Sequence, residues 1–257
     1  QAPRHLPGRG HRQSVGVDPG YLAAVTDTSD HSAFDLAFHW DPMCPFAWLT
    51  SKWVDQVVEQ RGFSVDWRLI SLRMLNADVN YDSTFPPEYI EGHTAGLQLL
   101  RVAAAVRDAE GPTPMRPWYR AMTAPLRECP PPGDGRTIPP AAEPDRVRSL
   151  LEACGLSSSY ADALTDERWD KVIEADTEAA LASTGRDVGT PIIRYQPPDG
   201  PAFFGPVISR VPDEDEAGPL WDAVLYLAQF PGFAELKRSL REPPNLPVFG
   251  PSPGDEG

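Results

Sequence analysis

One cysteine stands where a predicted strand ends and a predicted helix begins. Cys44 is followed by Pro45, whose fixed φ and missing N–H suit the first turn of a helix. A thiol at a helix N-terminus faces unpaired amides and the positive end of the helix dipole, which favour the thiolate. The sequence therefore predicts Cys44 as a low-pKa nucleophile, an effect that Asp41 opposes if its carboxylate points at the sulfur.

The position that would hold the second cysteine of a redox pair is Ala47. A two-cysteine site attacks a disulfide and resolves the mixed disulfide with its own second thiol. Because Ala47 closes that route within the motif, we expect a monothiol cycle completed by an external small thiol. Three alternatives stay open: Cys129 or Cys154 resolves the adduct, the alanine was engineered to trap a Cys-Pro-x-Cys site, or Cys44 is a buried packing residue.

Aromatic side chains near the cysteine in sequence, and others on a later helical segment, are candidates for a substrate pocket. Phe46 lies in the first turn of the predicted helix and is a candidate substrate contact. Ordinary packing between helices would also explain the others, and a lone histidine on a helix is commonly a surface or interface residue. These other candidates are Trp40, Trp48, Tyr89, His93 and Trp118.

Hydrophobic periodicity divides the chain into two α/β portions separated by a helical block. Residues 34–72 predict a β-α-β unit, whose strands should be parallel with a right-handed crossover. We predict strands at 34–40, 63–72, 190–195 and 202–207, and helices at 45–60, 87–109, 115–127, 144–153, 160–164, 166–184, 213–229 and 233–240.

The order of these elements is β-α-β, a helical block, then β-β-α, which predicts a thioredoxin-like α/β fold with an inserted all-helical domain. The predicted organisation is an N-terminal extension at 1–33, a thioredoxin-like domain at 34–72 and 189–241, a helical insertion at 73–188, and an irregular C-terminal tail at 242–257.

The sequence resembles the DsbA-like thioredoxin superfamily and is most similar to its actinobacterial mycothiol-dependent nitroreductase or reductase group. The segments that carry the resemblance are 40–53, 187–191, 203–208 and 232–238. The resemblance implies a low-molecular-weight thiol cofactor of the mycothiol type. It also implies that Thr190-Pro191 is the cis-proline turn beside the thiol, and the alternative is a rigid proline at a strand start. The cofactor-binding residues would be Pro45, Phe46, Ala47, Thr190 and Pro191.

Composition limits the classes of partner. Lys and Arg total 23 and Asp and Glu total 37, so the formal net charge is −14, which argues against nucleic acid and anionic membrane. No apolar run approaches the roughly 20 residues of a membrane span. The three cysteines have no zinc spacing, and no nucleotide-binding motif is visible. We expect a cytoplasmic protein with a small-molecule substrate and no metal, and a homodimer is compatible with the sequence.

The leading hypothesis is a thiol-dependent oxidoreductase that acts on a small electrophilic or disulfide substrate. One alternative is a transferase or isomerase similar to kappa-type glutathione transferases and chromene-carboxylate isomerases, in specialised metabolism. Another is a non-catalytic small-molecule binding protein. Related sequences would carry a histidine after the helix that holds Trp118, but residues 123–130 contain none. This departure leaves the substrate preference open.

Overall fold

A computed structural model describes residues 34–80, 84–129, 140–239 and 244–249. All of these residues belong to one compact unit, His31–Gly257. The N-terminal extension predicted at 1–33 lies outside the described residues. Among the residues that are described, no helix is long and apolar enough to cross a membrane.

Four strands form one mixed sheet in the order β2-β1-β3-β4. Strand β1 pairs in parallel with β2, and antiparallel pairs join β1 to β3 and β3 to β4. The parallel β-α-β unit predicted from residues 34–72 is thereby confirmed. The strands are β1 (Leu36–Trp40), β2 (Val65–Leu69), β3 (Ile192–Tyr195) and β4 (Ala202–Phe204).

Strand β4 is shorter than the predicted 202–207. It stops before Gly205, which adopts a positive φ of 89°, and before Pro206, which has no N–H to donate to a sheet ladder. The short strand leaves the carbonyl of Pro206 free to accept a hydrogen bond of 2.8 Å from the Thr50 hydroxyl. This contact ties the loop after β4 to the helix that follows Cys44.

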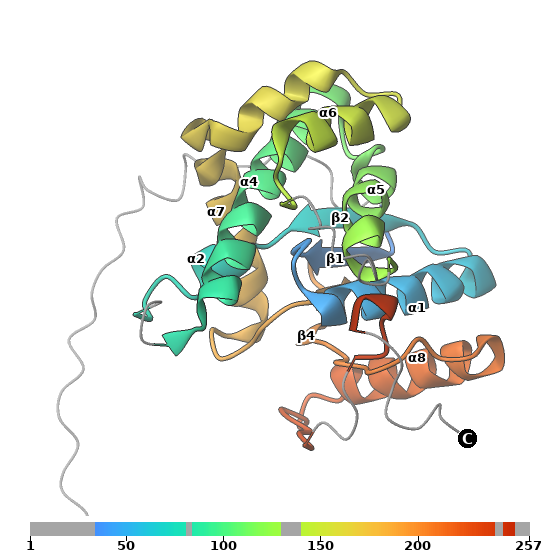
Figure 1. Ribbon diagram of the computed structural model, residues 1–257. Helices are drawn as coiled ribbons and strands as arrows, with labels where there is room; N and C mark the ends of the chain where they lie inside the picture. The colour runs from blue at the N-terminus through green and yellow to red at the C-terminus, as the bar shows by residue number, and fades with distance from the viewer. Residues whose placement is uncertain (1–33, 81–83, 130–139, 240–243, 250–257) are drawn as a thin grey trace, which may run out of the picture. The chain divides into compact units, whose positions relative to one another are not determined.

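Helices cover both faces of the sheet and build a separate layer above it (Figure 1). The predicted helix at 160–164 is a 3-10 helix, and the one predicted at 166–184 begins with a 3-10 turn. The helices are α1 (Pro45–Arg61), α2 (Leu72–Leu75), α4 (Pro87–Glu110), α5 (Met115–Arg127), α6 (Pro144–Ala153), η3 (Ser158–Thr165), η4 (Glu167–Trp169), α7 (Asp170–Thr184), α8 (Glu214–Gln229) and η5 (Pro247–Phe249).

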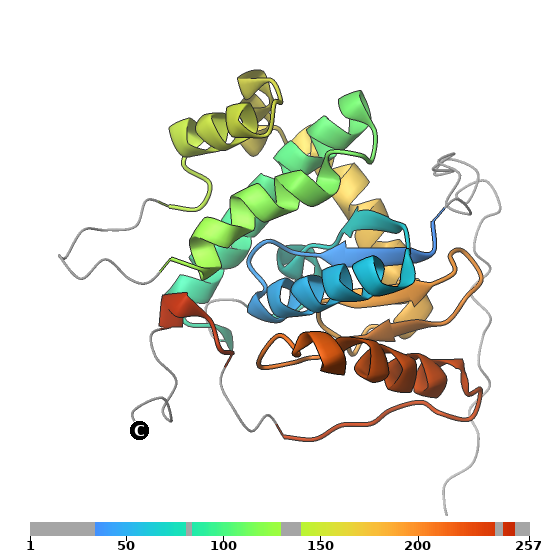
Figure 2. The same ribbon diagram turned by 90° about the vertical axis from the view of Figure 1, so that its right-hand side faces the viewer.

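Helices α1 and α8 lie side by side on one face of the sheet (Figure 2). Trp53 of α1 packs against Trp221 of α8 with ring centroids 5.7 Å apart, and its indole N–H donates to the carbonyl of Ala217 at 3.0 Å. Gly62 caps the C-terminus of α1 with a φ of 69°, a left-handed conformation that suits glycine. This packing holds the helix that carries the thiol at its N-terminus.

The prediction of a short helix at 233–240 is wrong, because the described residues 233–239 are irregular. Leu236 is 78% exposed, so this segment has no buried face to pack. An eight-residue helix pays the cost of nucleation, and without tertiary packing nothing offsets that cost.

The tail predicted as irregular contains a segment that docks on the domain. Leu246 is 3% exposed within the main hydrophobic core, and the amide of Asn245 donates to the carbonyl of Ser209 at 2.6 Å. The following turn, η5, lies beside α5 in both views (Figures 1 and 2). Residues 244–249 are therefore part of the fold.

Helix α7 is fastened to the opposite face by the buried carboxylate of Asp176. This carboxylate accepts hydrogen bonds from Arg68 at 3.0 Å, from the amide of Leu69 at 3.1 Å and from Arg107. Although burial raises the pKa of Asp176, the guanidinium groups of Arg107 and Arg68 hold it below its ordinary value. His39 of β1 faces the same carboxylate, and burial lowers its pKa to about 4.

Replacing His39 with glutamine should reduce the loss of stability at acid pH. The unfolded chain protonates His39 near pH 6.5 and the folded chain only near pH 4, so the unfolded state binds more protons between these values. The stability that His39 contributes therefore falls as the pH falls through this window. From pH 7.5 to 5.0 the loss attributable to His39 is about 2 kcal/mol. Urea unfolding of both proteins at the two pH values measures it.

The parent must be compared with the variant because the titration of Asp41 changes the stability in the opposite direction as the pH falls. Burial raises the pKa of Asp41 to about 6, so the folded state binds the extra proton between about pH 4 and 6. The parent's own pH dependence contains both effects, together with those of other groups such as His93, whose pKa burial lowers. Equal pH dependence in the parent and the His39→Gln variant would show that His39 does not titrate as its burial predicts.

Candidate functional site

Cys44 caps the N-terminus of α1, where the sequence places it. Its backbone is extended, with φ −82° and ψ 114°, and Pro45 occupies the first turn. The amide of Ala47 donates to Cys44 Sγ at 3.3 Å, so the sulfur takes the place of a capping oxygen. Residue 47 therefore contributes a backbone amide to the sulfur, and its alanine side chain contributes no thiol.

The other side of the sulfur faces the turn before β3. The Cys44 thiol donates to the carbonyl of Thr190 at 3.3 Å, across 146 residues of sequence. The Thr190–Pro191 peptide bond is cis. The Thr190 side chain is buried as well, and it acts to lower the pKa of the Cys44 thiol.

Asp41 organises the loop between β1 and Cys44. Its fully buried carboxylate accepts hydrogen bonds from the amide of Met43 at 2.7 Å and from the amide of Leu72 at 2.8 Å. The first bond closes the turn that leads to Cys44, and the second attaches this turn to the N-terminus of α2. Asp41 therefore couples the thiol loop to the start of the helical insertion.

Burial makes Cys44 less acidic than its position in sequence suggests. The residue is 6% exposed, and this desolvation raises the pKa of the thiol above its ordinary value. The nearby charge of Asp41 adds to the increase, while the amide of Ala47 works against it. The low pKa that a helix N-terminus favours is therefore not found for Cys44, because loss of water outweighs the helix amides.

One face of α5 carries polar groups that sequence reasoning missed as a set. Tyr119, Thr123 and Arg127 recur every fourth residue and so share a helix face. The Tyr119 hydroxyl, the Thr123 hydroxyl and the Arg127 Nε are buried and unpaired among the described residues. Arg127 Nη2 donates to the carbonyl of Met43, next to Cys44. The four-residue spacing of polar side chains on a half-buried helix is the signal that would have found them.

The predicted pocket tryptophans form a buried aromatic cluster. The rings of Trp40 and Trp48 lie 4.5 and 5.8 Å from the ring of Tyr119, and Trp118 is fully buried. Contact of these residues with a substrate stays a prediction. Pro45 and Phe46 are partly exposed beside Cys44, so they are better placed to meet an incoming molecule.

Tyr89 and His93 belong to the N-terminal part of α4. Tyr89 is 54% exposed, and its ring lies 5.9 Å from that of His93, which is largely buried. Helix α4 approaches the thiol loop at Gly96, where an added Cβ would lie 3.0 Å from Met43 Cγ and 3.1 Å from Asp41 Oδ1. The insertion therefore covers the thiol loop, but contact of Tyr89 or His93 with a substrate stays a prediction.

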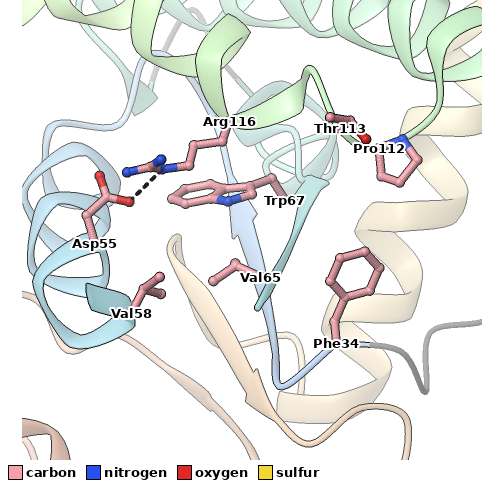
Figure 3. A pocket seen from close by; sticks show the side chains of 8 residues that line it. All are labelled: Phe34, Asp55, Val58, Val65, Trp67, Pro112, Thr113 and Arg116. Atoms are coloured by element: carbon pink, nitrogen blue, oxygen red, sulfur yellow. Dashed lines mark hydrogen bonds and ion pairs between the residues drawn. The ribbon is translucent and has the colours of Figure 1, made fainter. Parts of the chain in front are cut away.

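A separate cleft opens at the other end of the parallel strands (Figure 3). It encloses about 220 Å³, and an ion pair of 2.9 Å between Arg116 and Asp55 lies along its edge. Val65 begins β2 at this end, whereas Cys44 follows the carboxyl end of β1. None of the predicted site residues lines it. The lining residues are Phe34, Asp55, Val58, Val65, Trp67, Pro112, Thr113 and Arg116.

Within the described ranges, no group of three or more His, Cys, Asp or Glu side chains is arranged to hold a metal ion. The fold brings the Cys44 sulfur to the Thr190 carbonyl, and it places the Arg127 guanidinium on the carbonyl of Met43, the residue before Cys44. Asp41 adds a buried carboxyl whose pKa is about 6.

Comparison with known proteins identifies relatives of this sequence. Residues 43–238 match the profile of a family described as Rv2466c-like, mycothiol-dependent nitroreductase Rv2466c. This span contains both Cys44 and Thr190. The uncharacterized protein Rv2286c of Mycobacterium tuberculosis is 31% identical over 202 residues, which cover 78% of this chain and 80% of that protein.

Two solved structures show more distant likeness. The cytosolic disulfide reductase DsbM from Pseudomonas aeruginosa is 17% identical, with a TM-score of 0.42 over 75% of this chain and 99% of that chain. The reduced form of the disulfide bond oxidoreductase DsbG from Mycobacterium tuberculosis is 18% identical, with a TM-score of 0.34 over 72% of this chain and 82% of that chain. Likeness at this level carries no argument about function.

Substituting alanine for Gly96 should disturb the thiol loop, whereas the same change at Gly92 should not. Each substitution gains about 1 kcal/mol of helix propensity. At Gly96 the new methyl group presses on Oδ1 of the Asp41 carboxylate. The amides of Met43 and Leu72 hold this carboxylate through Oδ1 and Oδ2, and such overpacking costs about 1–3 kcal/mol. At Gly92 its closest contact is Met43 Cε at 3.7 Å, an ordinary distance.

We therefore expect Gly96→Ala to be less stable than Gly92→Ala by about 1–3 kcal/mol. It should also change the rate at which iodoacetamide alkylates Cys44. Chemical unfolding and intact mass measure the two effects. Equal stability and equal alkylation of the two variants would mean that α4 does not press on the Asp41 turn.

Proposed function

The chain belongs to the Rv2466c-like mycothiol-dependent nitroreductase family, and from this membership we propose a thiol-dependent oxidoreductase in which Cys44 is the single nucleophile. The observation that carries the proposal is the placement of the sulfur between the Ala47 amide and the Thr190 carbonyl. The amide stabilises negative charge on sulfur, and the carbonyl holds the neutral thiol in one orientation. A sulfur held in this way is oriented for attack.

The first step is attack by the Cys44 thiolate on one sulfur of a small disulfide. A bond forms between Cys44 Sγ and that sulfur, the disulfide bond breaks, and the other half leaves as a thiolate that takes up a proton. Cys44 is then held in a mixed disulfide. Because Ala47 has no thiol, the resolving electrons come from outside the motif.

The second step needs a low-molecular-weight thiol, for which the family description supports a thiol of the mycothiol type. Its thiolate attacks the mixed disulfide, forms a new disulfide with the bound half and releases Cys44 as a thiolate. Each turnover exchanges one external thiol for one thiol of the substrate. The cycle therefore consumes the external thiol in proportion to product, unlike an isomerase, which would return it.

Access to the sulfur is narrow. Since Cys44 is 6% exposed, the partly exposed Pro45 and Phe46 and the Thr190 turn form the approach that we assign to the thiol and the substrate. A small or extended molecule fits this approach better than a folded protein does. We assign this reaction to the cytoplasm, where low-molecular-weight thiols are kept reduced.

Replacing Cys44 with serine should abolish thiol-dependent turnover and leave the fold intact. A serine hydroxyl is far less acidic than a thiol and forms no disulfide, so turnover should fall by at least about 100-fold. Reduction of bis(2-hydroxyethyl) disulfide by mycothiol, with circular dichroism to check folding, measures the change. Cys129→Ser and Cys154→Ser are the matched controls, and each should keep parental turnover. Turnover retained by Cys44→Ser would refute the proposed function, and loss in Cys129→Ser would make Cys129 a participant.

Incubation with the disulfide form of mycothiol should leave one mycothiol on Cys44. The approach beside Phe46 and the Thr190 turn should favour this thiol over glutathione and coenzyme A. Intact mass before and after the reaction counts the adducts, and peptide mapping locates them. Equal labelling by all three disulfides would argue against selective recognition of the thiol, and labelling only at the exposed Cys129 would argue against Cys44 as the acceptor.

A further inference from the structure

Arg127 is a buried cation at the C-terminal end of α5. The residue is 8% exposed, and its Nη2 donates to the carbonyl of Met43, directly before Cys44. Its Nε is buried and has no partner among the described residues. A guanidinium stays protonated at every physiological pH, so this position always carries a positive charge.

The charged and titratable groups that face Arg127 come from three elements. They are Cys44 at the start of α1, Tyr119 on α5 and Asp41 in the loop after β1. Burial lowers the pKa of Arg127, and these three groups act to raise it, with Cys44 contributing most. In return, Arg127 acts to lower the pKa of Asp41. The guanidinium therefore interacts with both the buried carboxyl and the thiol.

We propose that Arg127 is the positioning residue that stabilises the anionic form of Cys44 in this closed site. The proposal rests on the proposed function, because it concerns the reactive state of the same sulfur. Arg127 acts through its charge on Cys44 and through its hydrogen bond to Met43, which fixes the turn that carries the sulfur.

The closed site needs such a cation because burial opposes ionisation. Taking the sulfur out of water disfavours the thiolate, and the nearby Asp41 disfavours it further. In a dry environment a neighbouring charge acts with less screening than at the surface, so one guanidinium offsets part of both effects. Without Arg127, the helix amides and the Thr190 side chain remain to oppose desolvation and the Asp41 carboxylate.

The hydrogen bond to Met43 separates two ways in which Arg127 could act. Glutamine keeps a donor for the Met43 carbonyl and loses the charge, whereas lysine keeps the charge and loses the planar guanidinium. A role limited to holding the turn predicts that glutamine is the better substitute. A role in stabilising the thiolate predicts that lysine is the better one.

The test is the pH midpoint for alkylation of Cys44 by iodoacetamide, read by intact mass in a Cys129→Ser, Cys154→Ser background. Arg127→Met and Arg127→Gln should raise this midpoint by about 1–2 pH units. Arg127→Lys should keep it within about 0.5 unit of the parent, and Asp41→Asn should lower it, because a nearby carboxylate disfavours the thiolate. Arg116→Gln, on the same helix and paired with Asp55 at the far cleft, is the matched control and should leave the midpoint unchanged.

A folded Arg127→Gln variant with the parental midpoint would overturn the proposal. Failure of both neutral variants to fold would also overturn it, because Arg127 would then be a requirement of folding. Alkylation needs neither mycothiol nor a substrate, so its outcome is independent of the turnover assay. Loss of turnover in the Arg127 variants together with a shifted midpoint supports both proposals. A shifted midpoint in these variants, when the parent itself shows no thiol-dependent turnover, removes only the proposed function.

Discussion

The Cys44 sulfur is held by two hydrogen bonds from parts of the chain that are far apart in sequence. The Ala47 amide approaches from α1 and the Thr190 carbonyl from the turn before β3, 146 residues away. The second contact exists only because β3 pairs antiparallel with β1, opposing Ile192 to His39. That register puts the start of β3 beside the end of β1. The thiol site therefore depends on correct pairing of the two halves of the sheet.

The helical insertion is joined to this site through one carboxylate. Asp41 accepts hydrogen bonds from an amide of the thiol loop and from an amide of α2. The missing side chain of Gly96 lets α4 pack closely against this carboxylate. The same burial that gives Asp41 this structural role raises its pKa and places an acidic group beside the sulfur. The buried carboxylate that holds the loop thus also makes the Cys44 thiol less acidic. In our proposal, the positive charge of Arg127 offsets part of this effect.

Local pattern predicted most of the elements, and two of its failures, at 233–240 and 244–249, have a common cause. The parallel unit at 34–72 and the long helices carry strong periodicity, so the sequence was sufficient for them. The helix predicted at 233–240 has a helical spacing but no surface to bury Leu236, and residues 244–249 dock through Leu246 without any periodic signal. In both places tertiary packing decides, and the pattern of a short segment does not record it.

The order of residues is enough to show where the candidate nucleophile stands and that no second cysteine follows it, because Cys44, Pro45 and Ala47 are neighbours along one helix start. It also indicated the Thr190 turn, through the resemblance of two short motifs. The acidity of the thiol and the cation that faces it depend on the packing of distant elements. Desolvation of Cys44 and the approach of Arg127 depend on atoms contributed by distant elements, and no local spacing specifies how closely those elements pack.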